Sequence, residues 1–216
     1  MELMFDLCLV STPPHYDHPW WVDNILYQFD RINVKPDNVH VIKNPIHFTS
    51  WNKLALFKKH KNNRQYLFLD LDTIIVKNNV LDWLSNDLSI LFNWWNSWPA
   101  TTSVNSSVMS WRGDYSYIYE HFLENDRYYI DTLKFQDLYM GKYFSKDLNL
   151  IQDRSCAYSY RWRKKSPMKI NYDSTYVLFN NGVWNMFKKE WKDYILQPIP
   201  DKVLEEVYAR FKATNS

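Results

Sequence analysis

Hydrophobic and polar positions along this chain follow two spacings, which predict alternating strands and helices. Apolar residues three or four positions apart predict helices over 20–29, 50–57, 115–122, 130–144 and from 200 onward, with a helical turn at 80–84. Short apolar runs predict strands at 3–10, 39–42, 66–77, 88–92, 107–111, 148–151, 156–160 and 175–179. This order predicts an α/β fold with a mostly parallel central sheet flanked by helices. In such sheets the ligand crevice lies at the carboxyl ends of the strands.

The length of the chain fits one domain with a sizeable core. It has 216 residues and shows no internal repeat or low-complexity linker. We therefore expect a single domain over residues 1–216, in which residues 183–216 form a C-terminal helical extension.

The central apolar run, residues 66–77, contains two aspartates, Asp70 and Asp72. Apolar residues on both sides of the acidic pair are typical of a strand buried on both faces. Residues i and i+2 of a strand share a face, so the carboxylates should converge at the carboxyl end of the strand. Two such carboxylates resist joint ionisation, and a hard cation, Mn²⁺ or Mg²⁺, would keep both charged. The alternative is a pair of aspartates exposed in a turn at the end of the strand.

Charge and glycine content exclude several classes of function. The formal net charge is +2 and basic residues are scattered, so no nucleic-acid partner is expected. The chain has three glycines and contains neither G-x-G-x-x-G nor a P-loop, which argues against Rossmann cofactor binding and NTPase chemistry.

The cysteines and the hydropathy pattern bear on location. Cys8 and Cys156 lie in apolar or aromatic surroundings, which favours buried thiols in a reducing compartment over a disulfide framework. No apolar run approaches the roughly 20 residues of a membrane span, and the N-terminus lacks the pattern of a signal peptide. We expect a cytoplasmic protein without a membrane span.

Aromatic residues make up 18% of the chain, and three of the 11 tryptophans follow the predicted strand 88–92. Trp94, Trp95 and Trp98 lie in a predicted loop beside the expected crevice. Flat exposed rings there would form a platform for a saccharide acceptor. The alternative is a packed aromatic cluster that belongs to the core.

Five segments together resemble one known family. Residues 68–76, F-L-D-L-D-T-I-I-V, resemble the D-x-D strand of GT-A glycosyltransferases, in particular glycogenin and the bacterial family 8 galactosyltransferases. Four further segments agree in order and rough spacing, and the match spans nearly the whole chain: W-N-K-L at 51–54, N-S-S-V-M at 105–109, F-Q-D at 135–137, and S-Y-R at 159–161 followed by V-L-F-N-N-G at 177–182.

The resemblance implies a single GT-A-like, Rossmann-like domain and a role for each matching residue. Asp70 would contact the ribose of the donor and the metal, and Asp72 would ligate the metal that holds the diphosphate. Gln136 and Asp137 would lie near the reacting centre. The remaining donor-binding residues would be Ser11 and Thr12 in the first loop, Lys53, Asn105, Ser106 and Arg161.

Three positions depart from the family pattern. Asn180 or Asn181 stands in place of the histidine that is usually the third protein ligand of the metal, so we expect Asn180 as a neutral, weaker ligand. The lysine near the following glycine is absent, and Arg161, Lys164 or Lys165 could supply its charge. Phe135 replaces the first aspartate of the D-Q-D segment, which removes a polar contact to the donor sugar.

The expected activity is that of a metal-dependent hexosyltransferase. It would move a sugar from a nucleoside diphosphate sugar, UDP-linked by resemblance, to a hydroxyl acceptor such as a saccharide. Resemblance favours retention of the anomeric configuration, whereas inversion would need a base, for which Asp137 is the candidate. Two alternatives stay open: a non-catalytic nucleotide-sugar-binding relative, and a haloacid-dehalogenase-type phosphatase with Asp70 as nucleophile.

Overall fold

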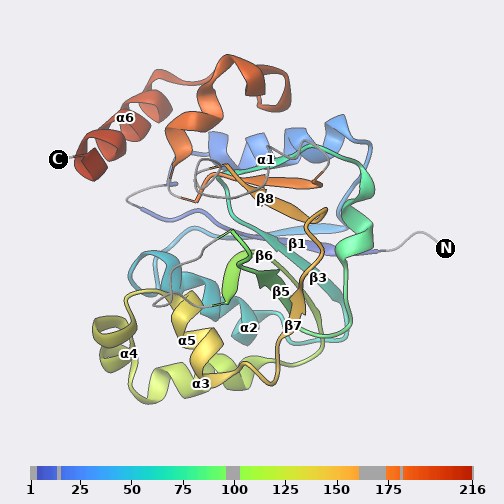
Figure 1. The fold of residues 1–216 in the computed structure, drawn as a ribbon, viewed down its shortest axis with the longest axis vertical. Coiled ribbons are helices and arrows are strands. Elements are labelled where there is room, and N and C mark those ends of the chain that lie inside the picture. The colour runs from blue at the N-terminus through green and yellow to red at the C-terminus, as the bar shows by residue number, and fades with distance from the viewer. Residues whose placement is uncertain (1–3, 14–15, 96–102, 161–173, 181, 216) are drawn as a thin grey trace.

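The structure is a computed structural model that describes residues 4–13, 16–95, 103–160, 174–180 and 182–215. Within these ranges, six strands form a central sheet in the order β2-β1-β3-β6-β5-β7 (Figure 1). The bounds of these strands are β1 Asp6–Val10, β2 Asn38–Ile42, β3 Gln65–Leu69, β5 Ser89–Phe92, β6 Val104–Arg112 and β7 Asn149–Ile151.

The direction of the strands confirms the predicted sheet. β1 pairs in parallel with β2 and β3, and β5 pairs in parallel with β7. β6 is antiparallel to both of its neighbours, β3 and β5. The sheet is therefore mostly parallel, and the carboxyl ends of its parallel strands lie at one edge.

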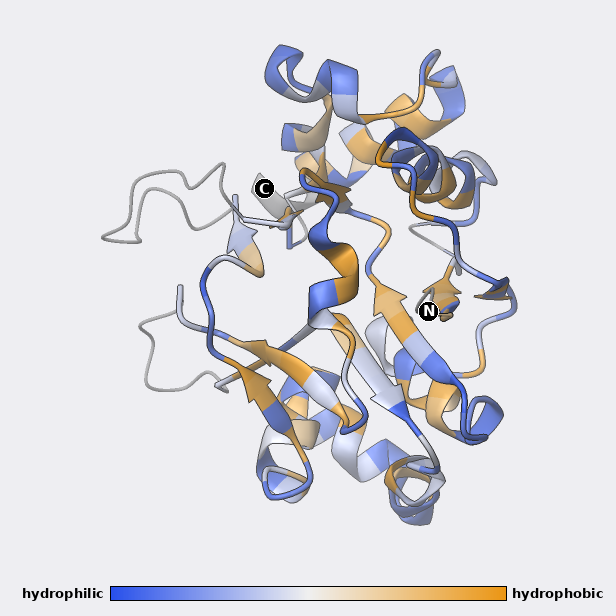
Figure 2. Cartoon of the chain, turned by 90° about the vertical axis from the view of Figure 1, so that its right-hand side faces the viewer, coloured by the Kyte–Doolittle hydropathy of each residue, from blue (hydrophilic) through white to orange (hydrophobic). Residues whose placement is uncertain are grey.

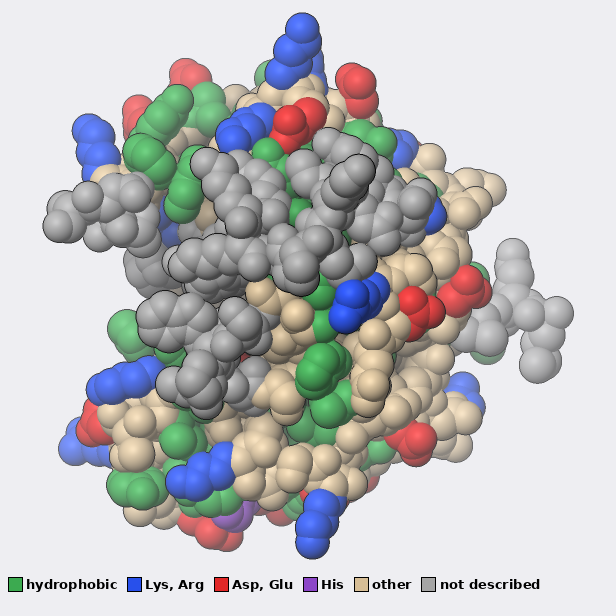
Figure 3. Space-filling model, in the orientation of Figure 1, with side chains coloured by type: hydrophobic (Ala, Val, Ile, Leu, Met, Phe, Trp, Pro, Cys, Tyr) green, Lys and Arg blue, Asp and Glu red, His purple; other side chains and the backbone are tan. Residues whose placement is uncertain are grey.

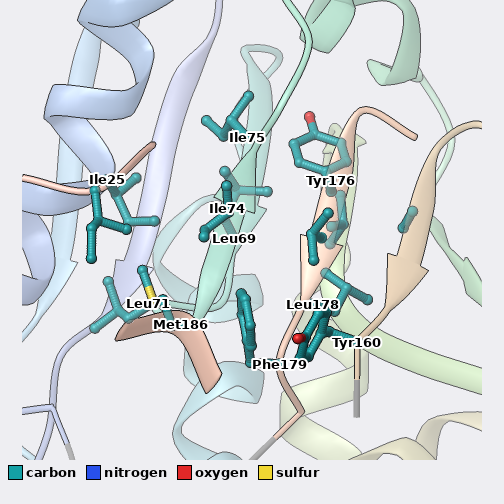
Figure 4. Packing of buried hydrophobic residues seen from close by; sticks show 14 of the residues in the cluster. Ile25, Leu69, Leu71, Ile74, Ile75, Tyr160, Tyr176, Leu178, Phe179 and Met186 are labelled. Carbon is teal, nitrogen blue, oxygen red and sulfur yellow. The ribbon is translucent and has the colours of Figure 1, made fainter. Parts of the chain in front are cut away.

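Two hydrophobic cores lie on the two faces of this sheet. Along β3, Leu67 and Leu69 belong to one core, whereas Tyr66 and Phe68 belong to the other. This alternation follows from the two-residue period of a strand. Figure 2 shows hydrophobic residues in several of the strands, and Figure 4 shows part of the first core around Leu69.

Helices cover both faces (Figure 1). One face carries α1 (Trp20–Arg31) together with the segments near the end of the chain, η3 (Val183–Phe187), η4 (Lys189–Tyr194) and α6 (Asp201–Asn215). The other face carries the short helical segments that follow β2 and the helices that follow β6: η1 (Thr49–Leu54), α2 (Ala55–Lys59), α3 (Ser116–Glu124), α4 (Asp126–Leu133) and α5 (Gln136–Tyr143). A further short segment, η2 (Asn79–Trp83), is the helical turn expected at 80–84.

The expected single strand over 66–77 is wrong. The chain ends β3 at Leu69, turns at Leu71 and Asp72, and begins β4 (Thr73–Ile75). β4 belongs to a second sheet of the described residues, with the order β4-β9-β8, in which β8 is Ala157–Ser159 and β9 is Tyr176–Leu178. Both halves of the run are buried, so hydrophobicity alone did not reveal the turn.

The two sheets pack against the same core. Figure 4 shows Ile74 and Ile75 of β4 beside Tyr176 and Leu178 of β9. α1 holds the other edge of β4, because the buried side chain of Gln28 hydrogen-bonds to its backbone at Thr73 and Ile75.

Two expected helices also differ in detail. The helix predicted over 130–144 is two helices, α4 and α5, and Lys134 between them has a φ of 64°. The helical spacing of the apolar residues from 200 onward favours burial of Val203, Leu204, Val207, Tyr208 and Phe211. In α6, Val203 and Val207 are buried, whereas Tyr208 and Phe211 are exposed.

Surface charge and thiols agree with the composition. Figure 3 shows described acidic and basic side chains interspersed on the face toward the viewer. Cys8 and Cys156 are both free and buried. Within the described residues, no helix is long and apolar enough to cross a membrane.

Candidate active site

The two aspartates lie in the turn that joins the two sheets. Asp70 directly follows β3, and its backbone N–H donates to the carbonyl of Ser107 on β6 at 2.9 Å. The carbonyl of Asp72 accepts from the backbone N–H of Phe179, directly after β9, at 3.2 Å. The residue Asp72 is 5% exposed, so this turn is not the solvent-exposed turn of the alternative interpretation.

Lys53 is the cation that contacts Asp70. It lies in η1, is 8% exposed, and its Nζ lies 2.8 Å from the nearer carboxylate oxygen of Asp70. The same ammonium donates to the hydroxyl of Ser106 at 3.1 Å. Sequence analysis placed these three residues in one site, and the structure brings them together.

Asn52 fixes the chain that leads into Lys53. Its amide oxygen accepts from the backbone N–H groups of Ile46 and His47 at 2.7 and 2.8 Å. Its amide nitrogen donates to the carbonyls of His47 and Thr49, each at 2.8 Å. A buried amide with four hydrogen bonds holds this loop in one conformation and so orients the neighbouring lysine.

Gln136 and Asp137 join the same network from the first turn of α5. The backbone N–H of Ser106 donates to the Asp137 carboxylate at 3.1 Å, and the side-chain amide of Gln136 donates to the same oxygen at 3.0 Å. The amide of Gln136 also donates to the hydroxyl of Ser106. Burial raises the pKa of the Asp137 carboxyl group above its ordinary value of 3.8, although Lys53 and the hydrogen bonds from Ser106 oppose this shift.

Asn180 gathers a second group of polar side chains. Its amide oxygen accepts from the hydroxyl of Ser107 at 3.2 Å and from the amide of Asn105 at 3.5 Å. Its amide nitrogen donates to the hydroxyl of Ser159 on β8 at 2.6 Å. The backbone of Asn180 has a φ of 46°, a conformation that asparagine adopts more readily than most residues.

The first loop follows β1. Ser11 and Thr12 are buried, and the backbone N–H of Ser11 donates to Ile42 at the end of β2 at 2.9 Å. The loop then turns back, because the hydroxyl of Ser11 and the carbonyl of Thr12 both hydrogen-bond to the backbone of Tyr16.

Trp94 and Trp95 do not form the exposed platform that we expected. Trp95 is 4% exposed and belongs to the core, and its ring packs edge-to-face against Trp94 at 5.3 Å. Trp94 is partly buried and lies 5.2 Å from the guanidinium of Arg154. This arrangement is the packed cluster of the alternative interpretation. Trp98 and Arg161 lie outside the described residues.

The oxygen donors of the site are compatible with a hard divalent cation. Asp70 and Asp72 supply two carboxylates from the same turn, and Asn180 supplies an amide oxygen that already accepts two hydrogen bonds. Among the described residues, no three His, Cys, Asp or Glu side chains form a cluster that could hold a metal ion. A donor set of one or two carboxylates fits Mg²⁺ when the substrate phosphates complete its coordination.

The order of the strands and the turn at the carboxyl edge are those of a GT-A-like fold, as the sequence predicted. No family model matches the chain, and no curated protein matches it by sequence.

Several solved structures share the fold. The galactosyltransferase LgtC, solved with donor and acceptor sugar analogs, matches with a TM-score of 0.63 at 10% identity, over 93% of this chain and 99% of LgtC. GlyE from Streptococcus pneumoniae TIGR4 matches with a TM-score of 0.67 at 9% identity, over 95% of this chain and 64% of GlyE. A glycosyltransferase involved in glycosylation of the major capsid of PBCV-1 matches with a TM-score of 0.56 at 10% identity, over 82% of this chain and 93% of that one. At such identities the likeness establishes the fold.

Sequence reasoning missed four side chains in or beside the site. Ser107 and Ser159 lie in segments that resemble the family, but the resemblance implies no role for either residue. The structure shows that both form hydrogen bonds with Asn180. No motif in the sequence marks Tyr16 or Arg210, because the cation–π contact between them joins opposite ends of the chain.

Proposed function

We propose that this protein is a metal-dependent glycosyltransferase that moves a sugar from a UDP-linked donor to a hydroxyl acceptor, with retention of the anomeric configuration. One observation carries the proposal: the aspartate pair lies at the carboxyl edge of a GT-A sheet, with Lys53 in contact with Asp70. The three structural neighbours described above are glycosyltransferases, and their shared fold supports it.

Charge on the leaving group explains why the site needs these residues. Departure of a nucleoside diphosphate places negative charge on its phosphate oxygens, and fixed positive groups lower the barrier by stabilising that charge. Lys53 already lies beside Asp70 and serves as a point charge for those oxygens. Asp70, Asp72 and Asn180 would hold Mn²⁺ or Mg²⁺, which would act as a Lewis acid on the diphosphate.

Polar side chains around Lys53 suit the binding of a sugar ring. The hydroxyl of Ser106 lies between Lys53 and Gln136, and Asn105 lies next to it in β6. In our proposal, these groups exchange part of their hydrogen bonds for sugar hydroxyls and so fix the ring for transfer. Phe135 is 59% exposed and adds an apolar surface at the start of α5.

The acceptor is a saccharide in this proposal, and Trp94 is the remaining described candidate to contact it. If the reaction inverts the anomeric carbon, Asp137 is the base, because its carboxylate lies in the Lys53–Ser106 network. The anomeric configuration of the product, measured by NMR, separates the two routes.

A thermal-shift screen of nucleoside diphosphate sugars with and without Mn²⁺ tests the proposal. A donor at about 100 times its Kd should raise the Tm by about 5–10 °C, because it binds the folded state alone. Asp72→Asn should abolish the Mn²⁺-dependent part of this shift. Asp87→Asn, which changes an exposed aspartate near β5, is the matched control and should leave the shift intact.

Each result leads to a different conclusion. The absence of any shift with all sugar nucleotides would overturn the proposal. Binding without transfer or hydrolysis would favour a non-catalytic nucleotide-sugar-binding protein. Turnover of a simple phosphate ester that depends on Asp70 would favour the phosphatase alternative.

A further inference from the structure

The C-terminal helix α6 packs beside the loop that follows β1. Val203 and Val207 anchor α6 in the first core, and the ring of Phe211 packs edge-to-face on Trp184 of η3 at 4.9 Å. Burial raises the pKa of Glu206 on the same helix, and the neighbouring carboxylate of Asp17 in the loop adds to this shift. The position of α6 is thus fixed by contacts on both sides of it.

Arg210 on α6 reaches Tyr16 in this loop. Its guanidinium lies 4.8 Å from the centroid of the Tyr16 ring, a cation–π distance. Tyr16 is itself held, because its backbone binds Thr12 and its ring packs edge-to-face on Trp21 at 5.0 Å. The guanidinium therefore has a fixed place against the same loop that carries Ser11 and Thr12.

Electrostatic coupling links Arg210 to the aspartate turn. Burial alone would lower the pKa of Arg210, yet the pKa is raised, because Tyr16 and the carboxylate of Asp72 stabilise the charged guanidinium. Burial, and then the charge of Asp72, raise the pKa of Tyr16. Asp72 and Arg210 thus lie close enough for their charges to interact, as Asp70 and Lys53 do by direct contact.

Sequence reasoning looked for a second cation near Asn180, where the family lysine is missing, and considered Arg161, Lys164 and Lys165. These three residues lie outside the described ranges. A described residue that brings a positive charge to Asp72 is Arg210 on α6, at the far end of the chain.

We propose that Arg210 is a further donor-binding residue, whose guanidinium binds the diphosphate of the nucleotide sugar from the Asp72 side of the site. This inference rests on the proposed function. A diphosphate adds negative charge next to two carboxylates, so cations on both sides are needed to hold it. The planar guanidinium offers paired N–H donors that match phosphate oxygens, and its stacking on Tyr16 keeps it oriented for them.

The test compares UDP with uridine, since the diphosphate distinguishes them. Isothermal titration in the presence of Mg²⁺ gives the Kd of each ligand for the wild type, Arg210→Ala and Arg210→Lys. Arg210→Ala should bind UDP about 10–100-fold more weakly and uridine equally well. Arg210→Lys keeps the charge but loses the paired donors, so we expect a smaller loss for UDP.

Lys212→Ala is the matched control, because it removes an exposed positive charge from the last turn of the same helix. It should leave both affinities unchanged. If Arg210→Ala fails to fold, the UDP to uridine ratio of Arg210→Lys decides the question.

Two outcomes would overturn the inference and are distinguishable. A wild type that prefers UDP, with the same UDP to uridine ratio in the folded Arg210 variants, would show that Arg210 only positions α6. A wild type that binds UDP no better than uridine would overturn the proposed function and this inference together.

Discussion

Asp137 shows how a single carboxyl group couples stability to pH in the candidate active site. Its pKa is raised mainly by burial, so the folded state binds its proton more tightly than the unfolded chain does. Stability from this group is therefore fully present below the ordinary pKa of 3.8 and is lost as the pH rises through the raised value. At neutral pH the buried charge lowers the free energy of unfolding.

We expect Asp137→Asn to gain stability relative to the wild type as the pH rises above 3.8, because asparagine does not titrate. The amide oxygen can still accept the hydrogen bonds from Ser106 and Gln136. Urea unfolding at several values between pH 4 and pH 7 measures the difference. Asp131→Asn, on an exposed position of α4, serves as control and should change the free energy of unfolding by less than about 0.5 kcal/mol. Parallel pH profiles for Asp137→Asn and the wild type would contradict the expectation.

At the scale of elements, a side chain on α1 completes the edge of β4. Gln28 accepts from the backbone N–H of Ile75 at 2.6 Å and donates to the carbonyl of Thr73 at 3.2 Å. β9 occupies the other edge of β4, so Gln28 takes the place of a neighbouring strand. Without Gln28, the backbone N–H of Ile75 and the carbonyl of Thr73 would be buried without a hydrogen-bond partner, which is unfavourable.

Gln28→Leu should lower the free energy of unfolding by about 2–4 kcal/mol, because two buried backbone groups lose their partner. Urea denaturation measures this change. Gln152→Leu, at an exposed position, should change the free energy of unfolding by less than about 0.5 kcal/mol. A Gln28 variant as stable as this control would show that other groups satisfy Thr73 and Ile75.

Sequence reasoning predicted most of these elements, and its errors share a cause. The spacing of apolar residues identified the strands of the central sheet and α1. Each of these elements buries side chains at regular positions, and this burial produces the spacing. The same reasoning missed the turn between β3 and β4, since the residues on both sides of it are equally buried. It also missed the break at Lys134, where no glycine or proline marks a positive φ.

The candidate site was partly predictable for a related reason. Lys53, Asp70, Ser106 and Asp137 carry their chemistry in local motifs, and the structure joins them by hydrogen bonds. Arg210 lies in an amphipathic helix that has no motif, and its partner Tyr16 is known only once the two ends of the chain meet. Tertiary contacts of this kind leave no periodic signal in one sequence.

At the scale of the whole molecule, a second charged cluster lies at the amino end of the sheet, away from the aspartate turn. Asp6 at the start of β1 accepts from Arg64 at 2.6 and 3.0 Å, from Asn38 at 2.9 Å, and lies 2.9 Å from a ring nitrogen of His40. Burial alone would raise the pKa of Asp6, but these hydrogen bonds outweigh it and the pKa is lowered. This cluster therefore stabilises the fold above the ordinary pKa of 3.8, and the stabilisation is lost as the pH falls through the lowered value.

We expect Asp6→Asn to lower the free energy of unfolding by about 1–3 kcal/mol at pH 7 and by less as the pH falls below 3.8. The affinity for UDP should stay unchanged, since the length of a five-residue strand, about 15 Å, separates Asp6 from the carboxyl edge. Urea unfolding and isothermal titration on the same samples test both parts. A changed Kd for UDP in a fully folded variant would show that the two ends of the sheet are coupled.

The turn that carries Asp70 and Asp72 is also a seam between the two sheets, because its first residue is bonded to β6 and its last to the segment after β9. Movement of the three-stranded sheet relative to the six-stranded sheet would displace Asp72 from Asp70 while the six-stranded sheet stayed intact. We therefore expect heating to weaken the binding of UDP before the central sheet unfolds.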